Sequence, residues 1–198
     1  MDDWIVIVIV VFVVAICIFY YYQNSDTLQL KCVVSSVDGN QYCVRDRNQV
    51  QEAADLLAKV TTKCKELVNY METKHPDDDR TKRLVSGFNP KKIMETLPTS
   101  SYTAYSENKG EKIAFCLSPK KNKGEDTLID EHTLTFVAIH ELSHVATESI
   151  GHKTEFWENF KFLLENAKEA NIHQPRDYNK EPKEYCSMQI QDNPYYDL

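Results

Sequence analysis

Hydrophobic residues recur every three or four positions between Asn48 and Lys74, and charged residues fill most of the positions between them. The apolar positions are Val50, Ala53, Leu57, Val60, Cys64, Leu67 and Met71. This spacing places one apolar face on an α-helix. The pattern stops at His75-Pro76, because proline cannot continue a helix. We predict one long amphipathic helix that covers the core of a domain.

Two shorter stretches have the pattern of β-strands. Residues 30–37 and 41–44 flank Asp38-Gly39, a dipeptide typical of tight hairpin turns. Residues 101–117 repeat the arrangement around a second polar turn. We therefore predict two β-hairpins, one on each side of the long helix. Residues 84–97, between that helix and the second hairpin, are predicted to mix short helix and loop.

The chain begins with a stretch of a different kind, because the 19 residues from Trp4 to Tyr22 carry no charge. As a helix this stretch is about 28 Å long, close to the thickness of a bilayer's hydrocarbon core. Aromatic residues stand at both of its ends, as they do at membrane interfaces. We predict a single-pass anchor in residues 1–22. A cleaved signal peptide is the alternative, but the acidic start Met1-Asp2-Asp3 is unlike the basic start of such peptides.

The remaining chain is predicted to form one domain. Residues 23–29 are polar and are predicted to be a juxtamembrane linker, and residues 30–198 are numerous enough to bury a core. The net charge is −7 at pH 7, and the sequence has no stripe of basic residues interleaved with aromatic ones. We therefore expect no nucleic-acid binding by this chain alone.

The orientation of the anchor rests on the charges beside it. No lysine or arginine precedes the apolar stretch, whereas Lys31 and two arginines follow it. This distribution favours the domain on the cytoplasmic side. Cys32 and Cys43 lie near opposite ends of the first predicted hairpin. A disulfide between them would imply an oxidising compartment, against the charge argument; the pairing stays open, with free thiols favoured.

The sequence His140-Glu141-Leu142-Ser143-His144 carries the chemistry. Two histidines four residues apart leave the same face of a helix about one turn apart. Both ring nitrogens then reach one Zn²⁺ at roughly 2.0–2.1 Å, with Glu141 at the open side of the ion. Apolar residues around the motif predict a buried helix that begins after Asp130 and ends at Gly151.

A third ligand is expected beyond this helix. Glu148 lies one more turn along the helix, about 6 Å beyond the second histidine, which is too far for a short carboxylate. Gly151 allows the chain to turn back, and His152 follows it. The predicted ligands of the ion are three imidazoles: His140, His144 and His152. Water would take the fourth position. If His152 were not a ligand, a carboxylate of the next helix would replace it, Glu158 or Glu165.

The motif from His140 to His144, followed by His152 and Phe156-Trp157, resembles the small zinc metallopeptidases of the WLM and SprT-like group. In that group a HELxH helix is followed by a His-x-x-x-Phe-Trp segment. The chain resembles most closely a set of predicted WLM-like metallopeptidases of large nucleocytoplasmic DNA viruses. Two more residues separate the second and third histidines than in the usual WLM spacing.

The resemblance implies both a fold and an activity. The implied fold is α+β and zincin-like, with a small mixed or antiparallel sheet packed on the metal helix and on the long amphipathic helix, after one transmembrane helix. The implied activity is zinc-dependent hydrolysis of peptide bonds in a protein or peptide substrate, at a host or virion membrane. Glu141 would take a proton from the attacking water. The alternatives are an inactive zinc-binding scaffold of the virion or membrane, and a hydrolase of another amide.

The resemblance also suggests roles for four further residues. In zinc peptidases of this architecture, the strand before the metal helix forms a sheet edge that pairs with extended substrate. On this basis Ala114 and Cys116 are candidates for substrate pairing. In the viral set the segment around Tyr185 returns beneath the zinc, so that either Tyr178 or Tyr185 would donate a hydrogen bond to a tetrahedral intermediate.

The chain after the metal helix is predicted from its apolar positions. A second helix is predicted to begin at Thr154, and we expect Phe156 and Trp157 to pack beneath the site and hold His152 in place. The tail, residues 172–198, is predicted to be irregular. His132 and His173 are expected to lie on the surface.

Overall fold

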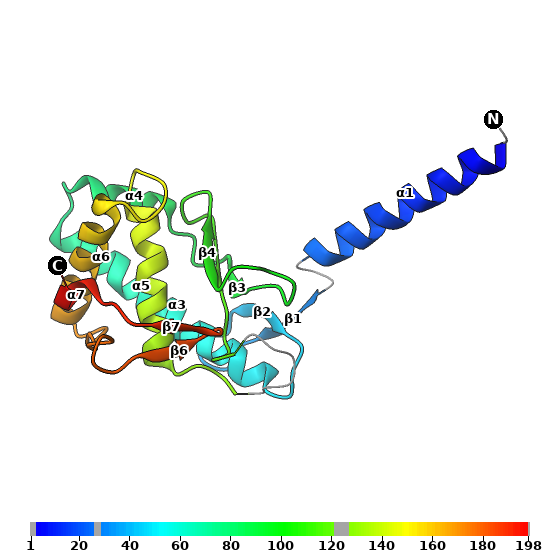
Figure 1. Cartoon of the computed structure of the whole chain (residues 1–198). Helices are drawn as coiled ribbons and strands as arrows, with labels where there is room; N and C mark the ends of the chain where they lie inside the picture. The colour runs from blue at the N-terminus through cyan, green and yellow to red at the C-terminus, as the bar shows by residue number, and fades with distance from the viewer. Residues whose placement is uncertain (1–2, 26–28, 121–126, 198) are drawn as a thin grey trace.

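The computed structural model describes residues 3–25, 29–120 and 127–197. Its architecture is mixed α+β, with one helix standing apart from the domain that contains all the others (Figure 1). The helices are α1 (Asp3–Asn24), α3 (Val50–Lys74), α4 (Asp79–Gly87), α5 (Glu131–Ala146), α6 (Thr154–Glu169) and α7 (Pro194–Asp197). The strands are β1 (Leu30–Val34), β2 (Gln41–Arg45), β3 (Ile93–Glu95), β4 (Ala104–Glu107), β5 (Lys112–Phe115), β6 (Lys183–Tyr185) and β7 (Met188–Ile190).

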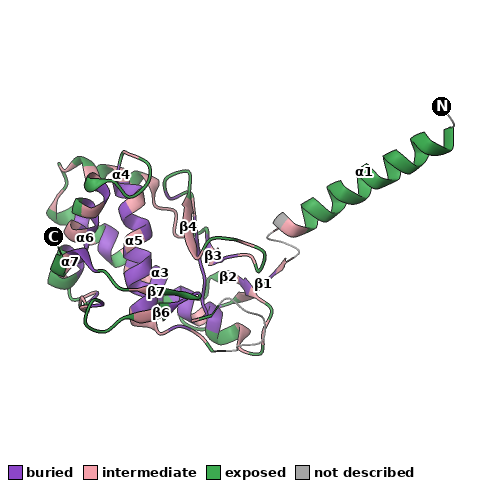
Figure 2. Cartoon of the chain, viewed as in Figure 1, coloured by how far each residue is buried: buried purple, intermediate pink, exposed green. Residues whose placement is uncertain are grey.

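Helix α1 confirms the predicted apolar N-terminal helix. Its segment Asp3–Gln23 is long and apolar enough to cross a membrane, although a signal sequence passes the same test. Its apolar side chains from Trp4 to Tyr22 are exposed, and most of this helix is green in Figure 2. Residues 26–28 of the predicted linker 23–29 lie outside the described residues.

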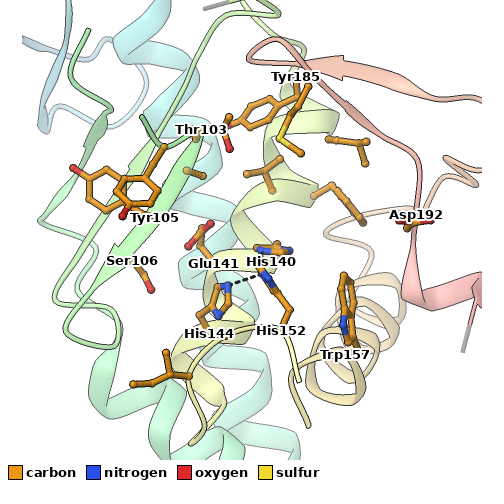
Figure 3. A pocket seen from close by; sticks show the side chains of 18 of the residues that line it. Thr103, Tyr105, Ser106, His140, Glu141, His144, His152, Trp157, Tyr185 and Asp192 are labelled. Carbon is orange, nitrogen blue, oxygen red and sulfur yellow. Dashed lines mark hydrogen bonds between the residues drawn. The ribbon is translucent and has the colours of Figure 1, made fainter. Parts of the chain in front are cut away.

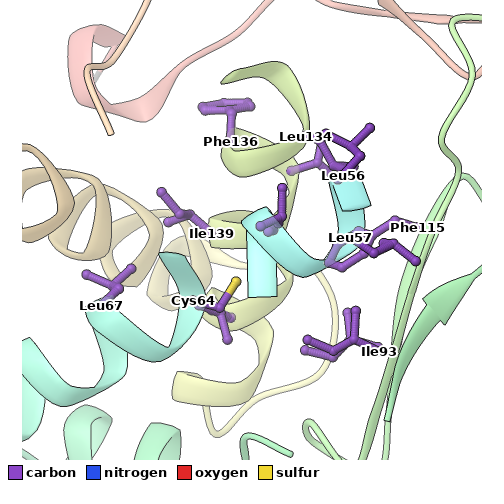
Figure 4. Close-up of a cluster of buried hydrophobic side chains, with 14 of the residues drawn as sticks. Leu56, Leu57, Cys64, Leu67, Ile93, Phe115, Leu134, Phe136 and Ile139 are labelled. Carbon is purple, nitrogen blue, oxygen red and sulfur yellow. The ribbon is translucent and has the colours of Figure 1, made fainter. Parts of the chain in front are cut away.

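The core of the domain lies where α3, the longest helix of the domain, packs against α5. Helix α3 occupies nearly the whole of the predicted range, and its apolar face packs against α5 and α6. Helix α5 is buried on almost every side, which agrees with the apolar residues around its motif. Figure 4 shows side chains of α3 meeting those of α5 and of the sheet: Leu56, Leu57, Cys64, Leu67, Ile93, Phe115, Leu134, Phe136 and Ile139.

The sheet beside this core has three strands in the order β3-β5-β4. Strand β3 is parallel to β5, and β4 is antiparallel to it. The strand before helix α5 is β5, which is therefore central, and the prediction that it forms the sheet edge is wrong. The physical reason is β3, which lies in the region predicted as helix and loop and covers one side of β5. The edge strand beside α5 is β4.

The first hairpin forms as predicted, but its cysteines are joined. Strands β1 and β2 pair antiparallel with Cys32 directly opposite Cys43, and the two residues form a disulfide. The expectation of free thiols is therefore wrong. A second disulfide joins Cys116, just after β5, to Cys186 in the C-terminal tail. That bond crosses 70 positions of the sequence, and no local pattern indicated it.

The C-terminal tail is more ordered than predicted. Strands β6 and β7 form a hairpin whose two turn residues, Cys186 and Ser187, have φ angles of 49° and 65°. The tail also covers the beginning of α5, and there His173 is only 3% exposed. Its ring centroid lies 4.3 Å from that of His132. The prediction that His173 lies on the surface is wrong because the tail folds back onto the domain.

Candidate metal centre

Helix α5 presents the HELSH motif. It begins as predicted after Asp130, whose carboxylate accepts a hydrogen bond from the amide of Thr133. It ends at Ala146, five residues before the predicted end at Gly151. Thr147 is already extended, and its hydroxyl donates to the carbonyl of Ser143 at 2.6 Å. Gly151 instead has a φ of 82° in the following loop, where it turns the chain back towards α5.

The three predicted ligands converge at the floor of a cleft (Figure 3). The Nε2 atom of His152 lies 3.0 Å from that of His140 and 3.1 Å from that of His144. Nitrogen atoms that bind one tetrahedral ion at roughly 2.0–2.1 Å lie about 3.3 Å from each other. The three side chains therefore fit a single ion such as Zn²⁺. The two extra residues between the second and third histidines are accommodated in the loop 147–153.

The three rings are also in the protonation state that a metal ligand needs. Burial, together with the neighbouring imidazoles, lowers the pKa of His140 to about 3. Burial and the nearby His152 lower the pKa of His144 to about 4. The pKa of His152 is lowered by burial as well. All three imidazoles are therefore neutral at physiological pH, with nitrogen lone pairs available for coordination.

Glu141 lies beside the histidines with an unused oxygen. Its side chain is buried, and its Oε2 atom has no hydrogen-bond partner among the described residues. Burial raises the pKa of this carboxyl group to about 8. A buried carboxylate oxygen without a partner costs free energy, so its presence calls for a ligand. A divalent ion carrying a water molecule supplies both a compensating positive charge and a donor, which is the second reason that the site fits Zn²⁺.

Aromatic rings of α6 support the histidines as predicted. Phe156 stacks on His144 with ring centroids 4.3 Å apart, and it meets His152 edge-on at 4.6 Å. The ring centroid of Trp157 lies 5.7 Å from that of His152. These rings limit the orientations available to the imidazoles, because tight packing leaves few free rotamers.

The cleft above the histidines has a volume of about 720 Å³ and two walls. One wall is the segment from Tyr102 to Ser106, which includes most of β4. The other is the segment from Met188 to Asp192, which includes β7. Figure 3 shows the walls meeting near Tyr185 and Thr103 and separating towards the histidines. Aromatic and aliphatic side chains make up much of the lining.

The remaining candidate residues have other positions. Ala114 is buried within the central strand β5, and Cys116 is disulfide-bonded to Cys186. Neither residue therefore lies at the edge of the sheet, where pairing with substrate was predicted. Tyr185 lines the cleft, but its hydroxyl donates to the carbonyl of Thr103 at 3.1 Å. Tyr178 packs against Phe136 and is not among the described residues that line the cleft.

The comparisons with known proteins point to viruses. No family model matches the chain, and no solved structure matches it. It is 28% identical over 165 residues to the uncharacterized protein R325 of Acanthamoeba polyphaga mimivirus, which covers 81% of this chain and 82% of that protein. It is 34% identical over 61 residues to the uncharacterized protein 136R of Invertebrate iridescent virus 6, which covers 31% of this chain and 34% of that protein. Viral relatives agree with the viral origin suggested by the motifs.

Proposed function

We propose that the chain is a membrane-anchored zinc peptidase. The observation that carries the proposal is the convergence of three neutral imidazoles beside the buried, unpartnered carboxyl group of Glu141, at the floor of an open cleft. His140, His144 and His152 would hold the ion. A zinc ion in such a site supplies a lowered pKa for a bound water molecule and polarises a substrate carbonyl.

Glu141 has the role of general base and acid in this proposal. Its Oε2 atom is free to accept a proton from the attacking water and to return it to the leaving amine nitrogen. Burial keeps bulk water away from this oxygen, so that the proton stays between the two groups. The bound cation would also oppose the effect of burial and hold the carboxyl group ionised at neutral pH.

The edge of β4 offers a place for an extended peptide. In the described part of the chain, β4 pairs with β5 on one side only, and its other side borders the cleft. A peptide that adds to this edge would bind through backbone hydrogen bonds, which tolerate many sequences. The role first assigned to Ala114 and Cys116 thus passes in this proposal to Ala104 and Ser106, because the carbonyl of Thr103 already accepts a hydrogen bond from the amide of Cys116 and backbone groups alternate in direction along a strand. The apolar lining favours hydrophobic side chains in the substrate.

The side of the membrane on which the domain lies is inferred from the charges beside the apolar helix and from the two disulfides. Only Lys31 carries a positive charge close to the apolar helix, so the charge argument for the cytoplasmic side is small. Two disulfides are characteristic of oxidising compartments. We therefore favour a domain on the non-cytoplasmic face of a host or virion membrane, in place of the orientation predicted from charge.

The proposal is tested with Glu141→Gln in the full-length chain, purified in detergent and loaded with zinc. The amide keeps the shape of the side chain but does not accept the proton. We expect one bound zinc per chain by elemental analysis, as in the wild type, together with loss of cleavage across a peptide library. Glu158→Gln is the matched control, because Glu158 is an exposed carboxylate on α6 and was the substitute third ligand.

Three results would contradict the proposal. The first is a wild-type chain that binds no zinc. The second is cleavage by the Glu141→Gln variant at the wild-type rate. The third is zinc binding with no cleavage of any peptide by the wild-type chain, which would favour an inactive zinc-binding scaffold instead. Cleavage that a chelator stops and added zinc restores would agree with the proposal.

A further inference from the structure

Lys109 lies at the end of the metal helix, although it belongs to the turn between β4 and β5. Its Nζ atom donates hydrogen bonds to three backbone carbonyls: those of His144 at 3.3 Å, Thr147 at 2.6 Å and Ser149 at 3.1 Å. The first belongs to the last turn of α5 and the other two to the loop that leads to His152. A single ammonium group thus joins the helix that carries two ligands to the loop that carries the third.

The close approach of this turn depends on two glycines. A Cβ atom on Gly110 would lie 2.7 Å from the carbonyl oxygen of Gly87 and 2.9 Å from a methyl group of Val145. A Cβ atom on Gly87 would lie 2.4 Å from the carbonyl oxygen of Lys109. The turn therefore packs directly on α4 and on the last turn of α5, within reach of the helix's terminal carbonyls. Such carbonyls lack partners within the helix and attract cations.

Glu155 binds the same loop through the loop's backbone amides, whereas Lys109 binds it through the loop's backbone carbonyls. Its carboxylate accepts hydrogen bonds from the amides of Glu148 at 3.1 Å and Ser149 at 3.2 Å. The loop is thus held by a cation on its carbonyls and by an anion on its amides. Phe156 and Trp157 pack on the ring of His152, but Ile150 is 84% exposed and contributes no burial to the turn of the loop. The polar contacts of Lys109 and Glu155 therefore restrain the backbone of the loop that carries the third ligand.

We propose that Lys109 is a positioning residue for the metal centre, which fixes the loop 147–152 so that His152 faces the two histidines of α5. The proposal rests on the zinc site proposed above but not on peptide cleavage. Lys109 acts through the backbone and does not contact the ion. Residues that orient metal ligands in this way typically change metal affinity by 10- to 100-fold when they are replaced.

The test is a double-mutant cycle on zinc affinity in the full-length chain in detergent. Lys109→Met removes the three donors and keeps most of the aliphatic side chain. We expect zinc affinity to fall by roughly 10- to 100-fold. In a His152→Ala background the same change should have almost no further effect, because the ligand that Lys109 positions is already absent. Lys109→Arg, which still presents N–H donors to the carbonyls, should restore most of the affinity.

Two further measurements separate positioning from a general loss of structure. The visible spectrum of the cobalt-loaded protein reports the coordination of the ion, and in Lys109→Met it should resemble that of His152→Ala. In the metal-free protein, amide hydrogen exchange should rise in residues 148–152 of the variant and stay unchanged in α3. Lys92→Met is the matched control, because Lys92 also lies beside this hairpin but pairs with Glu111.

Several results would overturn the inference. One is a Lys109→Met variant that binds zinc as tightly as the wild type. Another is a Lys109→Met change that lowers zinc affinity equally in the wild-type and His152→Ala backgrounds. Unchanged exchange in residues 148–152 of the metal-free variant would overturn the inference independently of any metal. If the wild-type chain bound no zinc, the proposed function would fail, while the exchange measurement would still decide whether Lys109 holds the loop.

Discussion

Replacing both cysteines of the Cys116–Cys186 disulfide with alanine should destabilise the domain more than the same replacement of Cys32 and Cys43. The first bond spans a sequence separation of 70 and the second a separation of 11. A cross-link stabilises a protein mainly by reducing the conformational entropy of the unfolded chain, and the effect grows with the length of the closed loop. These separations correspond to about 4.4 kcal/mol and about 2.8 kcal/mol at 25 °C.

The location of the longer cross-link adds a second consequence. Cys186 and Ser187 hold positive φ angles, which cost side-chain-bearing residues roughly 1–2 kcal/mol each. Besides the disulfide, the turn is fixed by hydrogen bonds from the amides of Cys186 and Ser187 to the carbonyls of Ser118 and Pro119. Without the disulfide, the turn should open before the rest of the domain does. The wall of the cleft that contains β7 should then become mobile.

The assay is equilibrium unfolding in urea of the two double-alanine variants and the wild type, in detergent and with a chelator present. We expect the variant without Cys116 and Cys186 to lose about 1.6 kcal/mol more than the other. Hydrogen exchange should show early opening of residues 183–192 in that variant alone. The reasoning would be refuted by equal losses, by the reverse order, or by unchanged protection of β6 and β7.

Two further predictions concern a buried histidine and a close-packed glycine. Burial, with the nearby positive charges of His132, Lys63 and Arg176, lowers the pKa of His173 to about 3, whereas the unfolded value is 6.5. The unfolded state therefore binds more protons below pH 6.5, so stability should fall with decreasing pH, by about 2 kcal/mol at pH 5. In His173→Phe the free energy of unfolding, measured by urea titration, should therefore fall between pH 7 and pH 5 by about 2 kcal/mol less than in the wild type. An equal fall in the two proteins would contradict the lowered pKa of His173. Gly110→Ala should destabilise the domain more than Gly39→Ala. Both glycines have positive φ, but of the two only Gly110 has heavy atoms of the described residues within 4 Å of an added Cβ atom. Equal unfolding free energies of the two variants would show that the turn does not pack tightly on α5.

The sequence predicted the parts of the site that depend on local spacing. The two histidines of α5, the turn at Gly151 and the approach of His152 follow from helical periodicity and the freedom of glycine. The long helix α3 was predicted for the same reason, since its apolar face repeats over many turns. Phe156 was placed correctly because it follows His152 by only four residues in the sequence.

The parts that were missed depend on contacts between distant residues. Strand β3 has only three residues, one of which is the buried Glu95, paired with Arg45 and Arg47. A strand of three residues that includes a charged one has no recognisable alternation of apolar and polar residues. Because β3 was not predicted, the order of the strands in the sheet could not be predicted either. Lys109 stands in a polar turn where a lysine is usually solvated, and nothing in its neighbourhood indicates that it reaches the metal helix.

The way in which the two walls of the cleft are joined has a mechanical consequence. At one end they are tied by the Cys116–Cys186 bond and by the hydrogen bond from Tyr185 to Thr103. At the other end the wall 188–192 continues into Asn193, which is buried and whose side chain donates a hydrogen bond to the carbonyl of Arg176. The wall that contains β7 is therefore anchored at both ends, and widening of the cleft requires movement of its middle. The walls lie further apart beside Trp157 and the histidines than beside Tyr185 (Figure 3), so a bulky group would have more room at the histidine end of the cleft. Under the proposed peptidase function, a folded protein substrate would have to present a loosened loop or terminus to this cleft.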